Sequence, residues 1–194
     1  MNCFGTPQVI FGKIFISKIL NPDRNFYFAG HGYFTAPEGD ESIVIRLKED
    51  QDGAEPSGNS VSCLNLLRLA AYTENSDYKL KAGQVINAYK STLEGFPVAL
   101  PEMTCALIML QNPPPQIIIS GKDPKELIKT AQTALLPQKI LLRADEKVKN
   151  SIFYQKLDIL KSIPTQENKA YLCQNYACSE PVSNSEELKK LLNA

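Results

Sequence analysis

The fold of this chain is set by the stretch Asn112-Pro113-Pro114-Pro115-Gln116-Ile117-Ile118-Ile119-Ser120-Gly121. Its proline run cannot continue a helix, because proline lacks the amide proton and fixes its own φ angle. The compact apolar segment that follows, residues 116–121, is typical of a strand inside a parallel sheet. We therefore predict a boundary at residue 112 between a helical unit, residues 31–112, and a small α/β unit with a mostly parallel sheet, residues 113–194.

Beyond the apolar strand, the sequence alternates between helix and strand signals. Asp123 is placed as an N-cap, with Pro124 at the first helical position and Glu126 three residues after the cap. The other elements expected here are strands over residues 139–143 and 170–173 and a helix over residues 185–192, with Ser183 and Glu186 at capping-box spacing.

Before the proline run, three segments have the apolar spacing of helices. They cover residues 61–71, residues 78–93 and a stretch that begins at Pro101. Apolar residues surround most of the first helix, so we expect it to be a buried helix. The isolated chain lacks the neighbours that would cover it, so we expect an exposed apolar patch and poor stability. Either Ser57 or Asn59 can act as its N-cap.

Two segments nearer the N-terminus are less regular. The β-branched residues within 42–47 predict a strand or an extended arm. Residues 1–30 show no sustained strand or helix period, so we treat them as an atypical N-terminal segment and assign no element there.

The composition argues against several classes of function. The 194 residues carry 21 basic and 21 acidic side chains, so no net field attracts nucleic acid or an anionic membrane. The apolar stretch over residues 9–20 is too short for a spanning helix and lacks the features of a signal peptide. A single histidine argues against a His-based zinc site, and we expect neither a metal nor a cofactor. Five cysteines, an odd number without dense spacing, favour a reduced, intracellular chain.

Several motifs match a known family. They are Arg46-Leu47-Lys48-Glu49-Asp50-Gln51-Asp52-Gly53-Ala54-Glu55-Pro56-Ser57-Gly58-Asn59-Ser60-Val61, followed by residues 65–70, together with residues 31–34, 97–103, 116–121 and 173–178. On these residues the chain resembles the spermatogenesis-associated protein 20 family and its bacterial relatives. The resemblance implies a long protein with an N-terminal thioredoxin-like domain and a helical domain similar to six-hairpin glycosidases and N-acylglucosamine epimerases. Residues 31–112 are then expected to form part of an α/α toroid of helical hairpins.

The resemblance also implies that parts of the family protein are missing here. No thioredoxin-type Cys-x-x-Cys occurs, and a toroid of six hairpins needs more helices than the three predicted before the proline run. We therefore expect a fragment, a shortened isoform or an incomplete gene model, which contacts the missing N-terminal domains. The expected role is non-catalytic. The alternative is a carbohydrate-processing or sugar-binding enzyme that is complete only in the full-length parent.

The loop before helix 61–71 is the candidate site, because it places carboxylates, an amide and hydroxyls at a helix N-terminus, where sugars and anions bind. Asp52 and Glu55 are the candidates for the acid/base pair of glycoside chemistry. The candidate ligand-binding residues, with a carbohydrate as the ligand in the parent, are Ser57, Asn59, His31 and Tyr33. Alternatively, the loop forms a tight turn and its polar side chains cap the backbone.

A second candidate is the pair Cys173 and Cys178. Their spacing is too long for the thioredoxin motif, and they lack the further Cys or His that a zinc site needs. The sequence leaves two alternatives open, a pair of inert buried thiols or a reversible disulfide with a redox role.

Overall fold

The computed structural model describes residues 27–28, 31–39, 41–146, 154–155, 157–174 and 177–193. The chain divides into two compact units. The helical unit comprises Met1–Ala70 and Ser76–Gln111, and the α/β unit comprises Ala71–Asn75 and Asn112–Ala194. The division after Gln111 therefore lies beside the proline run. Apart from residues 27 and 28, the segment 1–30 lies outside the described residues.

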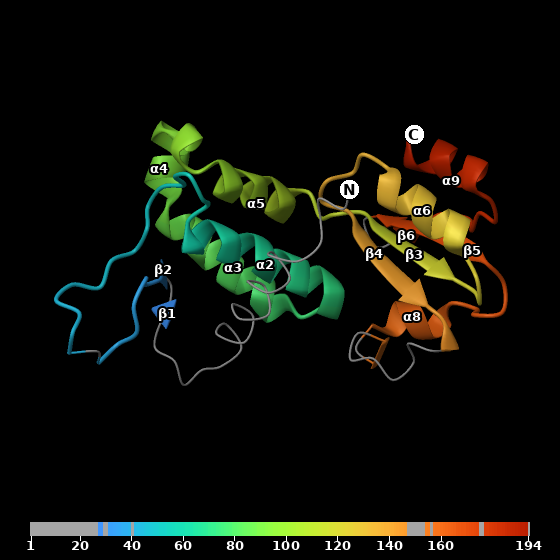
Figure 1. Cartoon of the computed structure of the whole chain (residues 1–194), viewed down its shortest axis with the longest axis horizontal. Helices are drawn as coiled ribbons and strands as arrows, with labels where there is room; N and C mark the ends of the chain where they lie inside the picture. The colour runs from blue at the N-terminus through green and yellow to red at the C-terminus, as the bar shows by residue number, and fades with distance from the viewer. Residues whose placement is uncertain are drawn as a thin grey trace. The chain divides into compact units, whose positions relative to one another are not determined.

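The helical unit is built mainly from α2 (Gly58–Thr73), α3 (Ser76–Ala88), α4 (Lys90–Gly95) and α5 (Pro101–Gln111), with the short 3-10 helix η1 (Pro97–Ala99) before α5 (Figure 1). The two-residue strands β1 (Tyr27–Phe28) and β2 (Gly32–Tyr33) pair antiparallel. Pro101 is the first residue of α5, as predicted. The helix predicted over residues 78–93 is divided, because the amide of Tyr89 donates to Ile86 O, three residues back, and ends the α-helical ladder.

Side chains from α2, α3 and α5 form the core of the helical unit. Leu66, Val85 and Met103, one from each helix, are completely buried. The prediction that helix α2 exposes an apolar patch is wrong, because these neighbours cover it. The large apolar side chains that are exposed among the described residues lie elsewhere: Val44, Ile45, Leu47, Leu80, Phe96, Val98, Ile108 and Leu135.

An arm without strand pairing occupies residues 41–47 and leads towards the start of α2 (Figure 1). It is irregular, with a turn at residues 41 and 42 and a bend at Val44, so the strand predicted within 42–47 does not form. At its end, the amide of Thr35 donates to Leu47 O at 2.8 Å. The Arg46 guanidinium lies 4.0 Å from the centre of the Phe34 ring, and the Lys48 ammonium lies 4.5 Å from it. Both distances suit cation–π attraction, which attaches the base of the arm to the residue after β2.

The α/β unit contains, in chain order, β3 (Gln116–Ser120), α6 (Lys125–Thr133), β4 (Ile140–Ala144), α8 (Asp158–Ser162), β5 (Lys169–Gln174), β6 (Ala177–Cys178) and α9 (Ser185–Leu192). The sheet order is β4-β3-β5-β6. Strands β3 and β4 are parallel, whereas β5 is antiparallel to both β3 and β6. The prediction of a mostly parallel sheet is therefore wrong. A helix connects β3 to β4, but β5 returns in the opposite direction and continues through a hairpin into β6.

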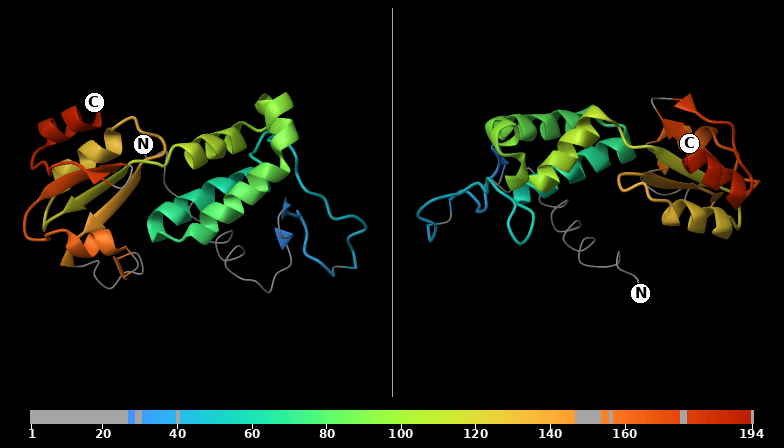
Figure 2. Two further views of the ribbon diagram at one scale, coloured as in Figure 1. Left: turned by 180° about the vertical axis from the view of Figure 1, so that it is seen from behind. Right: turned by 90° about the horizontal axis from the view of Figure 1, so that it is seen from above.

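Helices cover both faces of this sheet, which is why the three central residues of β3 are all isoleucine (Figure 2). Ile117 and Ile119 point to the face that α6 and α9 cover. Ile118 points to the opposite face, where it joins Leu160 of α8 and Cys173 of β5. The uniform isoleucine run is thus explained by burial on two sides.

The loop between β3 and α6 packs against Asn168, the residue before β5. Gly121 has a φ of +106°, and an added Cβ would lie 2.6 Å from the Asn168 Cα atom. The Asp123 amide donates to Asn168 Oδ1 at 3.2 Å, and Asn168 Nδ2 donates to Asp123 O at 3.2 Å. The prediction of Asp123 as N-cap is wrong, because this exchange holds Asp123 outside the helix and Pro124 occupies the N-cap position.

Helix α9 begins with a capping motif that lies one residue later than predicted. Asn184 is the N-cap, and its side chain accepts the amide of Glu187 at 2.9 Å. The Glu187 carboxylate in turn accepts the amide of Ser183 at 3.3 Å. The helix itself spans Ser185–Leu192, as predicted.

Candidate functional site

Asp52 uses both carboxylate oxygens to accept backbone hydrogen bonds. Oδ1 accepts the amide of Ser57 at 2.8 Å, and Oδ2 accepts the amide of Glu102 at 2.9 Å. The Asp52 amide donates to Ala99 O at 2.7 Å. Ser57 immediately precedes α2, and Glu102 lies in the first turn of α5. One carboxylate therefore binds the N-terminal ends of two helices, where its negative charge also complements the helix dipoles.

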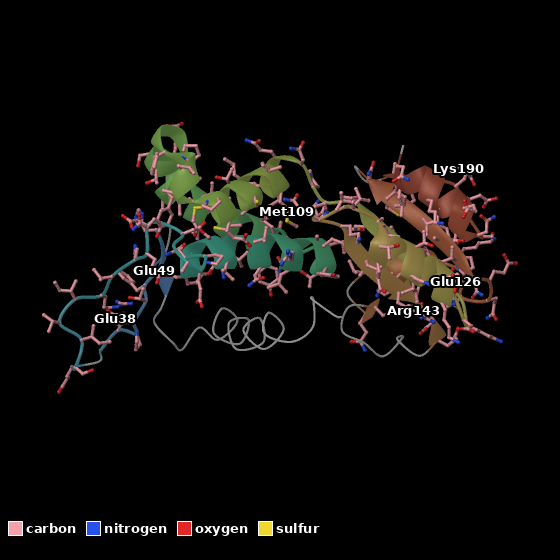
Figure 3. All side chains as sticks on the ribbon, turned by 45° about the horizontal axis from the view of Figure 1, so that its top comes forward. Glu38, Glu49, Met109, Glu126, Arg143 and Lys190 are labelled. Atoms are coloured by element: carbon pink, nitrogen blue, oxygen red, sulfur yellow. A yellow bond between two sulfur atoms is a disulfide. The ribbon has the colours of Figure 1, made fainter. Side chains whose placement is uncertain are left out.

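Ser57 caps helix α2. Its side chain is buried, and its Oγ accepts the amide of Ser60 at 3.2 Å. The next amide, that of Gly58, donates to Glu49 Oε2 at 2.9 Å, and Glu49 lies beside the start of α2 in Figure 3. Of the two N-cap alternatives, the structure selects Ser57, while Asn59 has a different role.

Asn59 attaches strand β2 to helix α2. Its Oδ1 accepts the amide of Tyr33 at 2.7 Å, and its Nδ2 donates to Tyr33 O at 3.0 Å. The buried amide side chain thus pairs with a backbone residue as a neighbouring strand would. Gly32, which precedes Tyr33, has a φ of +86°, and an added Cβ would lie 2.6 Å from Asn59 Oδ1. Only glycine fits there without a shift of the amide group.

Glu49 and Tyr89 complete this network. Glu49 lies within the stretch 46–61 that resembles the family, but neither residue was predicted as a site residue. The Tyr89 hydroxyl donates to Glu49 O at 3.0 Å. Burial, with a smaller effect from the Asp50 charge, raises the pKa of Tyr89 to about 12. Burial also raises the pKa of the Cys63 thiol on α2 to about 12. Both groups are therefore neutral at physiological pH, and Tyr89 keeps its proton for the hydrogen bond.

The remaining candidates of the loop lie on the surface. Glu55 is exposed, and its carbonyl accepts the amide of Gly53 at 3.0 Å. His31 is also exposed, and its carbonyl accepts Lys48 Nζ at 3.0 Å. The predicted residues that gather at the start of α2 are therefore Asp52, Ser57, Asn59 and Tyr33.

This geometry suits a structural loop. A general acid or base must reach the atom whose proton it transfers, but the Asp52 oxygens are directed at two backbone amides of the protein. Ser57 and Asn59 are buried and are likewise bonded to the backbone. The arrangement thus agrees with the cap-and-turn alternative, while the catalytic roles of Asp52 and Glu55 stay predictions.

Cys173 and Cys178 are joined by a disulfide that links β5 to β6. Cys173 is buried and Cys178 is exposed. The prediction of two buried thiols is therefore wrong, because one cysteine lies on the surface and both are oxidised. The redox role of the pair stays a prediction.

In the part of the chain that the structure describes, no group of three or more His, Cys, Asp and Glu side chains is arranged to hold a metal ion. No helix in the same residues has the length and apolar character needed to cross a membrane.

The fold and the site together define a class of protein with a helical unit and a mixed α/β unit. In the helical unit, side chains bonded to the backbone hold the loop before α2 in place. No protein-family profile matches the chain. It is 40% identical over 171 residues to spermatogenesis-associated protein 20 of Homo sapiens, and the same figures hold for the Mus musculus protein. An uncharacterized protein of Caenorhabditis elegans is 32% identical over 174 residues.

The human and mouse alignments cover 84% of this chain and 22% of each relative. The nematode alignment covers 86% of this chain and 23% of that relative. The chain belongs to the spermatogenesis-associated protein 20 family, as the motifs around Asp52 predicted. It spans less than a quarter of the length of these relatives.

Proposed function

We propose that this chain is a non-catalytic, structural part of a larger protein of the spermatogenesis-associated protein 20 family. The observation that carries the proposal is the engagement of both Asp52 oxygens by backbone amides. A carboxylate used in this way stabilises the start of two helices, because it accepts from a backbone amide at each of them and its charge complements their dipoles. A carbohydrate-processing role has no comparable support, because the Asp52 oxygens accept backbone amides of the protein and Glu55 is exposed in the same loop.

We also propose that this chain contacts the rest of the family-length protein through the exposed arm, residues 41–47. Val44 is 95% exposed, Ile45 is 70% exposed and Leu47 is 63% exposed. Three neighbouring exposed apolar side chains are typical of a surface that another part of the protein covers. In this proposal the covering part is the N-terminal portion, where the helices of this chain add to an α/α toroid.

The test uses the human relative with its 171 aligned residues deleted, mixed with this chain. We expect a complex that size-exclusion chromatography and calorimetry detect. Burying an apolar side chain contributes about 1.5–3 kcal/mol, so the double substitution Val44→Asp and Ile45→Asp should weaken binding about a hundredfold or more.

Two controls make the result specific. Leu135→Asp alters a side chain that is 93% exposed in the α/β unit, and it should leave binding unchanged. The deleted human segment, supplied separately, shows whether the truncated relative can bind at all. If that segment binds and this chain does not, or if Leu135→Asp weakens binding as much as the arm variant, the proposed contact is wrong.

A further inference from the structure

The disulfide between Cys173 and Cys178 closes the hairpin of β5 and β6. The two residues are directly opposed in the antiparallel register, with Cα atoms 3.9 Å apart. The next pair is Leu172 and Ser179, whose amide donates to Leu172 O at 2.8 Å. Because hydrogen-bonded and non-hydrogen-bonded pairs alternate, the cysteines occupy a non-hydrogen-bonded position, where opposed side chains are closest.

The two sulfur atoms have different environments. Cys173 is 6% exposed and belongs to an apolar cluster that includes Ile118 and Leu142. Cys178 is exposed and lies on β6, a two-residue strand at the edge of the sheet. A thiol that arrives from solvent therefore has access to Cys178 but not to Cys173.

Strand β6 has few other attachments to the sheet. Both of its residues, Ala177 and Cys178, are exposed. Beyond β6, Ser179 is bonded to Leu172 of β5, with its amide donating to Leu172 O at 2.8 Å and its Oγ accepting the Leu172 amide at 3.3 Å. Val182 then exchanges two hydrogen bonds with Ala170, at 2.8 and 2.9 Å. Leu188 of α9 is then completely buried in the core. Breaking the disulfide should therefore release the hairpin end and leave β5, Val182 and α9 in place.

From this asymmetry we propose that Cys173 and Cys178 form a thiol–disulfide exchange site for a small soluble monothiol of the glutathione type. The thiolate of the first monothiol attacks Cys178 Sγ. The new sulfur–sulfur bond joins the monothiol to Cys178, the bond to Cys173 breaks, and Cys173 leaves as a thiolate that takes a proton.

A second monothiol completes the reaction. Its thiolate attacks the monothiol sulfur of the mixed disulfide, so that the oxidised monothiol leaves and Cys178 is released as a thiolate that takes a proton. The protein disulfide gains two electrons and two protons, and two monothiols are oxidised to one disulfide. The reverse sequence restores the bond, and the hairpin alternates between a closed and an open form.

The first test measures the equilibrium in the whole chain under native conditions. The chain is incubated at different ratios of reduced to oxidised glutathione, quenched with acid, alkylated and analysed by peptide mass spectrometry. We expect the fraction of the Cys173–Cys178 disulfide to follow the ratio and to reverse with it. Far-UV circular dichroism of the unquenched samples should stay unchanged as evidence that the fold persists. A disulfide that persists at every ratio, or thiols that never pair, would overturn the proposal.

The second test examines which sulfur is attacked. With oxidised glutathione, Cys173→Ala retains the exposed cysteine and should form a mixed disulfide about tenfold faster, or more, than Cys178→Ser, which retains the buried one. Alanine is used at position 173 because it is apolar, and circular dichroism checks that both variants fold. Equal rates in the two folded variants would contradict attack at Cys178.

A third measurement follows the opening of the β5–β6 hairpin in the unsubstituted chain. Reduction should accelerate hydrogen exchange of the Ser179 amide about tenfold or more and leave the amide of Ile118 in β3 unchanged. Unchanged exchange at Ser179 would show that the disulfide does not control the hairpin.

Discussion

Replacing Asp52 by asparagine separates the structural use of this side chain from a catalytic one. The substitution preserves the shape of the side chain but removes its charge and one acceptor. The amide oxygen of asparagine can still accept from either Ser57 or Glu102, but its NH₂ group must then face the other backbone donor. A structural Asp52 therefore predicts a loss of stability, whereas a catalytic Asp52 predicts lost turnover without one.

The expected magnitude follows from the two hydrogen bonds. A hydrogen bond to a charged group contributes about 1.5–3 kcal/mol, and the substitution removes one such bond and weakens the other. Asp52 is partly exposed, so water offsets part of this loss. We expect the free energy of unfolding to fall by about 2 kcal/mol. In a chain of this length, that corresponds to a decrease of about 4–8 °C in Tm.

The assay is urea and thermal unfolding followed by far-UV circular dichroism. Glu55→Gln is the matched control, because it makes the same chemical change at an exposed position of the same loop, and it should alter stability by no more than about 0.5 kcal/mol. Asp52→Ala removes both acceptors and should be less stable than Asp52→Asn. Equal stability of Asp52→Asn and Glu55→Gln would refute the structural assignment of Asp52.

Three further predictions concern other parts of the chain. Gly121→Ala should destabilise the protein by about 1–3 kcal/mol more than Gly39→Ala in urea unfolding, since both glycines have a positive φ but only Gly121 faces a close neighbour. Asn184→Ala should cost about 1 kcal/mol through the lost cap of α9, and an unchanged midpoint would contradict that cap. Burial raises the pKa of Cys63 and of Tyr89 to about 12, from ordinary values near 9 and 10. Stability should therefore be complete below pH 9 and decline as pH rises towards 12, and Tyr89→Phe should make that decline shallower.

The sequence predicted most helices and strands because their signals are local. Pro101 marks the first turn of α5, and the apolar run from Gln116 marks β3. The direction of β5 could not be predicted in the same way, because an isolated strand pattern does not specify which partner it joins or in which direction. The isoleucine run of β3 suggested a parallel sheet, but burial by helices on both faces produces the same pattern in a mixed sheet.

The residue types of the loop predicted the candidate site, but the role of each side chain depends on contacts between distant parts of the chain. Asp52 accepts from Ser57, which is near in sequence, and from Glu102, which is 50 residues away. No motif could indicate the second donor, because a backbone amide carries no sequence signature. Glu49 was missed for a similar reason, since two of its contacts use its carbonyl group.

One long-range relation in the sequence does have a physical explanation in the structure. The motif at residues 31–34 and the motif around Asn59 both match the family, although 26 residues separate Tyr33 from Asn59. Asn59 pairs with the backbone of Tyr33 only because Gly32 has no Cβ, which would lie 2.6 Å from the Asn59 oxygen. Each motif thus requires the other for packing. A specific sequence match in a polar loop is therefore weak evidence for catalysis when its side chains are bonded to the protein's own backbone.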